Sequence, residues 1–269
     1  MTIHGVVAHY YEEPGGFYGY YNDVRRLKME QVPELHLPKM YDPPICWLKY
    51  PAPDNSSGGQ VWAGPNWGPL SNHLLSTSYG QSDLMAILWE QIDGVPQGGE
   101  VTLPLKFASG IMRARVNPKD GQVWVCGLKG WQTNASMEGC FQRVRYTGKP
   151  AHIPVDLHVL HDGISLTFSD PLDKLSAADD QNYGIEQWNY RWSGTYGSPE
   201  FKVSNPSQQG HDIVDVKTAK LSIDGKTITL QTDPLKPVMQ MDIQMHIKAA
   251  DGAAIDWDVA NTINKVPAQ

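Results

Sequence analysis

Two short groups of polar and aromatic residues in the sequence suit the binding of a sugar. Asn66 precedes Trp67, and Trp131 is followed by Gln132 and, two residues later, by Asn134. An indole ring can stack on the apolar face of a sugar, and neighbouring amides can hydrogen-bond its hydroxyl groups. These five residues are therefore the candidate ligand-binding residues. The alternative is that both tryptophans pack between structural units in the core.

A repeated sequence precedes both tryptophans. Gly-Gln-Val-Trp occurs at Gly59–Trp62 and at Gly121–Trp124, so the copies start 62 residues apart (121 − 59), and a candidate tryptophan follows each within seven residues. Each copy is also followed by a segment that ends in Tyr and Gly, at Leu74–Gly80 and at Phe141–Gly148. Self-similarity at a fixed period indicates a repeated supersecondary unit. Chance combined with β-propensity is the alternative explanation.

The segments around the repeat predict an all-β unit. Leu84–Trp89, Val101–Phe107 and Ile111–Val116 are short apolar segments separated by turn signals such as Asp-Gly and Gly-Gly. In the last segment, Arg113 and Arg115 alternate with apolar residues, which is the pattern of a half-buried strand. The unit best matches a β-propeller blade with long loops. Equivalent loops of such blades emerge on one face, so we expect the two tryptophan loops to lie together.

The pattern changes near residue 150, where we predict a domain boundary. Residues 1–150 are predicted to form the C-terminal blades of a β-propeller, about two in number, and residues 151–269 an Ig-like antiparallel β-sandwich. About seven short strands with turns between them support the sandwich. In Met239–Ile247, for example, apolar residues occupy alternate positions and would share one face of a sheet.

Neither the acidic residues nor the histidines predict a metal site in this chain. Four aspartates between residues 169 and 180 could form a calcium loop, but their spacing does not match an EF-hand, and caps on short helical turns are favoured. They are Asp170, Asp173, Asp179 and Asp180. The nine histidines show no metal-ligand spacing.

Three cysteines leave the redox state of the chain open. Cys46, Cys126 and Cys140 form no C-x-x-C pair and no haem-attachment motif. Cys126 and Cys140 flank the Trp131 loop and could form a disulfide that closes it. Buried free thiols are the favoured alternative.

Charge and hydropathy argue against two classes of partner. The chain has 22 basic and 29 acidic residues, a net charge of −7, and its basic residues are scattered apart from Arg25–Lys28. Such a protein is a poor binder of nucleic acid. No apolar stretch approaches the ~20 residues that span a bilayer. Residues 1–16 have no apolar core, so no signal peptide is expected there.

The sequence contains no complete catalytic signature. It has no G-x-S-x-G nucleophile motif, no P-loop and no dinucleotide-binding glycine motif. A glycosidase needs two facing carboxylates, and the sequence singles out no such pair. The catalytic residues are therefore unknown.

Several longer motifs are informative together: Tyr41–Trp47, Asp54–Trp62, Gly127–Asn134, Arg145–Pro150 and Gln187–Trp192. They resemble the C-terminal part of large secreted bacterial propeller proteins of the type found in Planctomycetes and Verrucomicrobia. Their propeller is similar to that of soluble sugar dehydrogenases that use pyrroloquinoline quinone (PQQ), and many are joined to a c-type cytochrome domain. The resemblance covers the chain from about Gly15.

This resemblance implies that the chain is the C-terminal fragment of a secreted quinoprotein sugar or alcohol dehydrogenase-like protein, located in the periplasm or outside the cell. PQQ, calcium and haem c would belong to the longer parent, whose N-terminal blades this chain lacks, and no cofactor is expected in the chain itself. The fragment is not expected to be catalytic on its own. The alternative is a non-catalytic module that binds carbohydrate or mediates contacts at the cell surface.

Overall fold

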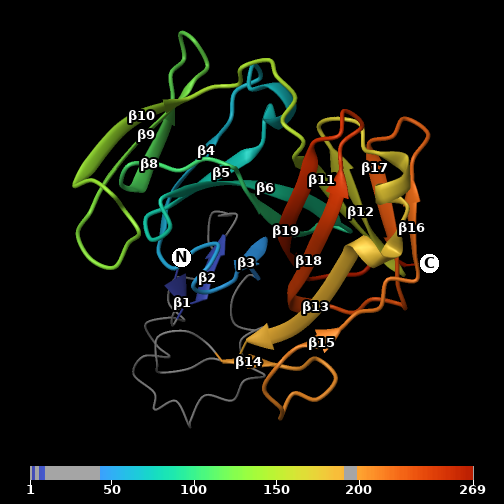
Figure 1. The fold of residues 1–269 in the computed structure, drawn as a ribbon. Coiled ribbons are helices and arrows are strands. Elements are labelled where there is room, and N and C mark those ends of the chain that lie inside the picture. Colours follow the sequence, from blue (N-terminus) through green and yellow to red (C-terminus); the bar gives the residue numbers. More distant parts are fainter. Residues whose placement is uncertain (1, 4–5, 10–42, 191–198, 269) are drawn as a thin grey trace.

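The computed structural model describes residues 2–3, 6–9, 43–190 and 199–268, drawn as a coloured ribbon in Figure 1. Strands account for 50% of the residues and helices for 5%, and the sheets are antiparallel, which confirms the all-β class. None of the sheets in the described part closes on itself. The helices of that part also lack the length and apolar character needed to cross a bilayer.

The described residues include nineteen strands and three short helices. The first group of strands is β1 (Thr2–Ile3), β2 (Val6–His9), β3 (Cys46–Leu48), β4 (Ser57–Trp62), β5 (Leu74–Ser78), β6 (Asp83–Ile92), β7 (Val95–Thr102), β8 (Gly110–Val116), β9 (Val123–Leu128) and β10 (Gly139–Val144). The second is β11 (Pro154–Leu160), β12 (Gly163–Phe168), β13 (Tyr183–Tyr190), β14 (Glu200–Phe201), β15 (Asp212–Ile213), β16 (Thr218–Leu221), β17 (Thr227–Gln231), β18 (Val238–Lys248) and β19 (Ala254–Ile263). The helices are η3 (Gly68–Leu70), α3 (Lys174–Ala177) and η4 (Asp180–Asn182).

One long sheet joins the two parts of the chain. Its strand order is β14-β13-β18-β19-β7-β6-β5-β4, with β15 also paired to β13. The central β7–β19 pair links segments on either side of residue 150, with Val101 opposite Val259 and Gly99 opposite Asn261. Hydrogen bonds of a single sheet therefore cross the expected boundary, which itself stays a prediction.

The first hydrophobic core lies between this sheet and the four-stranded sheet β11-β12-β17-β16. Leu157, Leu166 and Leu230 project from the smaller sheet, and Ile243 and Val259 from the long one, and all are almost completely buried. The alternation predicted for Met239–Ile247 is confirmed from Met241 onwards, since every second side chain enters this core. Two sheets packed face to face give the C-terminal part a sandwich-like form (Figure 1).

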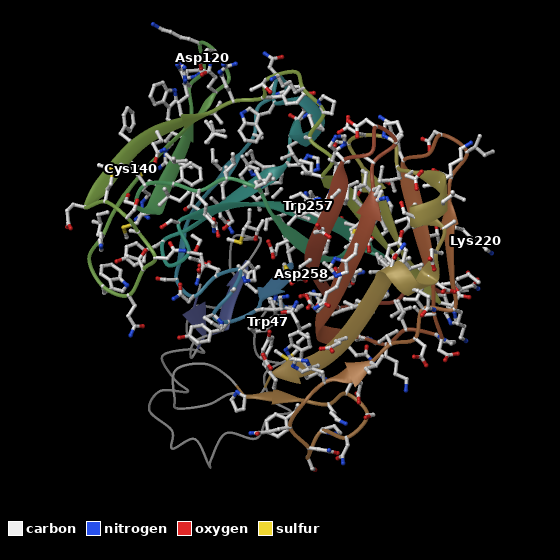
Figure 2. All side chains as sticks on the ribbon, viewed as in Figure 1. Trp47, Asp120, Cys140, Lys220, Trp257 and Asp258 are labelled. Atoms are coloured by element: carbon white, nitrogen blue, oxygen red, sulfur yellow. The ribbon has the colours of Figure 1, made fainter. Side chains whose placement is uncertain are left out.

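A second core lies between the other end of the long sheet and the three-stranded sheet β8-β9-β10. Ile111, Ala114, Val123 and Val125 face it from the smaller sheet. Trp257, which is labelled in Figure 2, packs against both cores and lies at the junction between them. Its indole N–H donates a hydrogen bond of 2.9 Å to the carbonyl oxygen of His152.

The expected strand at Val101–Phe107 is wrong in its bounds, because β7 begins at Val95. The turn between β6 and β7 consists of Asp93 and Gly94 alone, with φ angles of 49° and 79°, as in a tight hairpin. The second glycine pair, expected to be a turn, lies inside β7. A Cβ atom on Gly98 would lie 2.1 Å from the carbonyl oxygen of Leu88, so glycine is required there for close strand packing.

Cys126 and Cys140 form no disulfide. They lie on neighbouring strands, but Cys126 is opposite Phe141, the residue after Cys140. Successive side chains of a strand point to opposite faces of the sheet, so the two thiols are on different sides. Cys126 is exposed and Cys140 is half-buried, which also corrects the favoured alternative of two buried thiols.

Two of the four aspartates between residues 170 and 180 cap short helices. The carboxylate of Asp173 accepts a hydrogen bond from the N–H of Ser176 and caps α3, and Asp179 caps η4 through the N–H of Gln181. These contacts confirm the interpretation as helical caps for Asp173 and Asp179. Asp170 instead accepts hydrogen bonds from the N–H groups of Ala151 and His152, and Asp180 accepts one from the side-chain amide of Gln181.

Residues 151–269 are expected to lose stability when they are produced without residues 1–150. Strand β19 would lose its partner β7, and the first core would lose Leu88 and Val101, whose burial contributes about 1.5–3 kcal/mol each. The free energy of unfolding should fall by on the order of 3–6 kcal/mol, measured by urea denaturation of the fragment and the full chain. Equal stability of the two would contradict this expectation.

Candidate functional site

The Trp131 loop, between β9 and β10, is held in place by Tyr79. The buried Tyr79 hydroxyl accepts hydrogen bonds from the backbone N–H groups of Gly130 (3.0 Å) and Trp131 (2.7 Å). It also donates one to the carbonyl oxygen of Trp131 at 3.2 Å. The two aromatic rings pack with their centroids 4.4 Å apart. Because the hydroxyl uses its proton and both lone pairs, one buried side chain fixes the loop.

Three of the five predicted binding residues lie in this loop. Trp131 is 60% exposed, and Gln132 and Asn134 are exposed as well. The N–H of Asn134 donates to the carbonyl oxygen of Gly80 at 3.0 Å, and its side-chain amide donates to the Gln81 side chain at 3.3 Å. The loop therefore presents an indole and two amides on a fixed backbone.

The other two predicted residues lie elsewhere. Trp67 is 5% exposed and packs in the second core, so the alternative of a core tryptophan is right for this residue. Asn66 is exposed and lies beside Gly121, because a Cβ atom on Gly121 would be 3.8 Å from its Cβ. Gly121 precedes β9, whereas Trp131 follows it, and six strand residues span roughly 17–20 Å. The structure does not bring the two tryptophan loops together.

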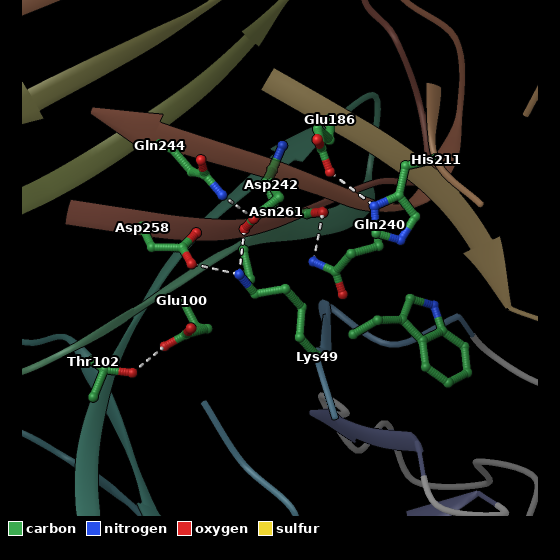
Figure 3. A network of polar contacts seen from close by, with 12 residues as sticks. Lys49, Glu100, Thr102, Glu186, His211, Gln240, Asp242, Gln244, Asp258 and Asn261 are labelled. Atoms are coloured by element: carbon green, nitrogen blue, oxygen red, sulfur yellow. Dashed lines mark hydrogen bonds and ion pairs between the residues drawn. The ribbon is translucent and has the colours of Figure 1, made fainter. Parts of the chain in front are cut away.

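A second candidate site lies on the face of the long sheet opposite the first core (Figure 3). The ammonium group of Lys49, just after β3, lies 2.5 Å from a carboxylate oxygen of Asp242 on β18 and 2.5 Å from one of Asp258 on β19. Glu100 on β7 shares a register row with Asp242, with the small Ala260 between them. We call Lys49, Glu100, Asp242 and Asp258 the Lys49 cluster.

Burial and mutual repulsion shift the protonation of this cluster. Glu100 is 2% exposed, and burial raises the pKa of its carboxyl group to about 8. Burial and the neighbouring Asp242 raise the pKa of Asp258 to about 7. Burial opposes the charge on Lys49, but Asp242 and Asp258 outweigh it and raise the lysine pKa. Near pH 7, Glu100 therefore carries a proton while Lys49 stays charged.

His211 extends the polar face beside the cluster. Its Nδ1 lies 2.8 Å from Glu186, which is opposite Asp242 in the sheet register, and its Nε2 lies 2.9 Å from Glu200. The imidazole stacks on Trp188 with centroids 3.9 Å apart. Burial lowers the pKa of His211, but the two glutamates outweigh it, so the pKa is raised and the charged form is favoured.

The contacts of the Lys49 cluster make it a clamp between β3 and the long sheet. Lys49 and Asp242 are buried or nearly so, and each is bonded to the other, while Glu100 accepts a hydrogen bond from the Thr102 hydroxyl at 3.3 Å. Asp258 is the member with a half-exposed side chain.

The sequence contained a signal for this cluster. The alternation in Met239–Ile247 identifies the apolar face, and the residues between the apolar ones are Gln240, Asp242, Gln244 and His246. Their polarity indicates that the opposite face of β18 meets polar groups. No pattern shows that Lys49, almost 200 residues earlier, provides the counter-charge.

The variant Lys49→Met is expected to lower the free energy of unfolding by about 3 kcal/mol, because it leaves the buried Asp242 without its cation. The control is Lys217→Met, which removes the exposed ion pair with Asp233 and should cost at most about 1 kcal/mol. Urea denaturation at pH 7 of both variants measures the difference. Similar losses in the two would contradict the clamp.

The variant Glu100→Gln tests the protonation of the cluster. The unfolded glutamate titrates near 4.5 and the folded one near 8, so the folded state binds more protons between these values, and wild-type stability falls as pH rises. Glutamine does not titrate, so the variant lacks this loss. Between pH 5 and pH 8 the free energy of unfolding of the variant should therefore rise relative to that of the wild type by on the order of 1–3 kcal/mol. The exposed control Glu138→Gln should show no such shift. If the stability of Glu100→Gln depends on pH in the same way as that of the wild type, the protonation assigned to Glu100 is wrong.

The resemblance to quinoprotein propellers remains a prediction that rests on the motifs of the sequence. The long sheet and the β8-β9-β10 sheet are both open in the described part of the chain. In comparisons with known proteins, the chain matches no protein-family model, no curated protein and no solved structure.

Proposed function

We propose that the chain is a polysaccharide-binding module in which Trp131 stacks on a sugar ring. One observation carries the proposal: Trp131 is 60% exposed, although its loop is fixed by the buried Tyr79. A large exposed aromatic group on an ordered backbone is typical of a binding surface.

The fixed loop lowers the cost of binding. A mobile loop would lose conformational entropy when it closes on a ligand, whereas the Trp131 backbone is already ordered by Tyr79 and by the hydrogen bond from the N–H of Asn134 to Gly80. The Thr133 hydroxyl adds a bond of 2.8 Å to the Tyr79 carbonyl oxygen. The loop is thus preorganised around its exposed indole.

The amides near Trp131 supply the polar part of such a site. Gln132 and Asn134 are exposed in the same loop and offer both donors and acceptors to sugar hydroxyl groups. Asn66 and Trp67 are left out of the proposed site, because they lie at the other end of β9. The binding residues are therefore Trp131, Gln132 and Asn134.

The place of this module in a longer protein is the second part of the proposal. Motifs such as Asp54–Trp62 and Arg145–Pro150 support a C-terminal part of a secreted quinoprotein dehydrogenase-like protein, with propeller blades before an Ig-like sandwich. PQQ, calcium and haem c would be held by upstream domains of that parent. A binding module there would keep a sugar-oxidising domain close to its polymeric substrate.

The variant Trp131→Ala is expected to weaken the binding of oligosaccharides by roughly 5- to 30-fold, since an aromatic stacking contact contributes on the order of 1–2 kcal/mol. The control is Trp62→Ala, which removes another exposed tryptophan. Trp62 lies at the far end of β4 from Tyr79, because the opposite end of this strand, at Ser57, pairs with Ser78. Glycan-array screening followed by calorimetry measures binding.

A thermal melt of each variant separates binding from stability. Trp131 is largely exposed, so its truncation should change the free energy of unfolding by less than about 1 kcal/mol. If Trp131→Ala leaves glycan binding unchanged, or if the wild-type chain binds no glycan, the proposed function is wrong.

A further inference from the structure

The outer face of the β8-β9-β10 sheet gathers three arginines around two aromatic rings. We call Arg113, Arg115, Trp124, Phe141 and Arg143 the arginine–aromatic face. Arg115 and Arg143 are both opposite Trp124, from β8 and β10 respectively, while Arg113 and Phe141 are both opposite Cys126. The five side chains therefore form two neighbouring rows on one side of the sheet, because residues two apart in a strand share a face.

None of the described residues covers this face. All three arginines are exposed, Phe141 is 72% exposed, and the opposite side of the same sheet packs on the second core. The guanidinium groups of Arg113 and Arg115 donate to the carbonyl oxygens of Met112 and Ala114, both at 2.7 Å. In the part of the chain that the structure describes, no carboxylate pairs with any of the three arginines.

The clustering of these cations distinguishes them from the other basic residues. The chain has 29 acidic and only 22 basic residues, yet three arginines share one face without a counter-charge among the described residues. An arginine retains several unused N–H donors when one is bonded to the carbonyl oxygen of the preceding residue. The face therefore offers bidentate sites to carboxylate or sulfate groups.

The two aromatic rings shape this surface. Trp124 and Phe141 stack with centroids 5.0 Å apart and an interplanar angle of 25°, and the Arg143 guanidinium lies 5.7 Å from the Trp124 ring. One side of each ring is used in the stack. What remains is mainly the outer side of Phe141, enough for a single sugar ring between charged groups.

The face is continuous with the Trp131 loop. Leu128 follows Trp124 and Cys126 on the same side of β9 and is 41% exposed. A Cβ atom on Gly130 would lie 3.1 Å from the end of the Leu128 side chain and 3.5 Å from the Tyr79 hydroxyl. A polymer chain could therefore extend from Trp131 along β9 to the arginines.

We propose that the arginine–aromatic face selects an anionic polysaccharide by pairing Arg113, Arg115 and Arg143 with its carboxylate or sulfate groups, an inference that rests on the proposed polysaccharide-binding function. Single-stranded nucleic acid has related chemistry but fits less well. It needs successive open ring faces on which its bases can stack, and the stacked Trp124 and Phe141 do not provide them.

The test compares acidic polymers with neutral forms of the same backbone. The probes are polygalacturonate with its methyl ester, and dextran sulfate with dextran, measured by affinity electrophoresis and calorimetry at low and high salt. The wild-type chain is expected to bind at least one acidic probe 10-fold or more tighter than its neutral form, and added salt should reduce this preference. The triple variant Arg113→Gln/Arg115→Gln/Arg143→Gln should lose it.

A matched control removes three positive charges elsewhere. In Lys220→Gln/Lys236→Gln/Lys248→Gln the substituted lysines are exposed on the C-terminal part, so the net charge changes equally and the preference should persist. Thermal melts should show both triple variants folded, since every substituted side chain is at the surface.

The outcomes separate this inference from the proposed function. Neutral glycans that bind through Trp131 without any acidic preference would overturn the role of the arginines and leave the module intact. Loss of preference in the lysine control would overturn it too, because net charge alone would then explain the effect. No binding to any glycan would refute both proposals. Binding of an oligothymidylate that requires the arginines, without glycan binding, would replace the polysaccharide by nucleic acid.

Discussion

The hydrogen-bonded pairing of β7 with β19 is the interaction on which the rest of the structure depends. It joins a segment near residue 100 to one near residue 260, and it places Val101 beside Val259 in the first core. On the other face of the same strands it places Glu100 beside Ala260. Both the apolar core and the Lys49 cluster are therefore consequences of one register, and a shift by one residue would exchange the two faces.

The two faces of the long sheet are stabilised by different interactions. The first core is stabilised by the burial of aliphatic side chains, which needs no specific direction. The Lys49 cluster buries acidic groups, which is unfavourable unless a cation and hydrogen bonds compensate. Lys49 supplies the cation to Asp242, and Glu100 remains neutral by keeping its proton. The strand β3 is positioned by this requirement as well as by the buried side chains of Cys46 and Leu48 and of Ile45 just before the strand.

Local patterns predicted the strands of the chain better than its repeat predicted the arrangement of those strands. The alternation of Arg113 and Arg115 correctly indicated an exposed side of β8, because period-2 patterning reflects burial directly. The Gly-Gln-Val-Trp copies proved not to be equivalent. The first lies within β4, an edge strand of the long sheet, whereas the second begins in the turn at Gly121 and enters the middle strand of a three-stranded sheet. Identical short sequences can adopt different positions because long-range pairing decides their environment.

The same distinction explains the outcome for the binding residues. The sequence identified Trp131, Gln132 and Asn134 by type, but the support from Tyr79 depends on a contact between residues 52 positions apart. Trp67 has the same flanking chemistry and is buried in the second core. The arginines of β8 and β10 appeared scattered along the chain, and only the pairing of both strands with β9 brings them together.

The orientation of Cys126 makes the arginine–aromatic face open to site-selective labelling. Of the three thiols, Cys46 is buried and Cys140 is half-buried towards the second core, whereas Cys126 is exposed on the outer side of β9 between Arg113 and Phe141. A maleimide dye should therefore react there first, without any engineered cysteine. A change in the fluorescence of the dye would then report the binding of a ligand to the arginine–aromatic face of the native chain.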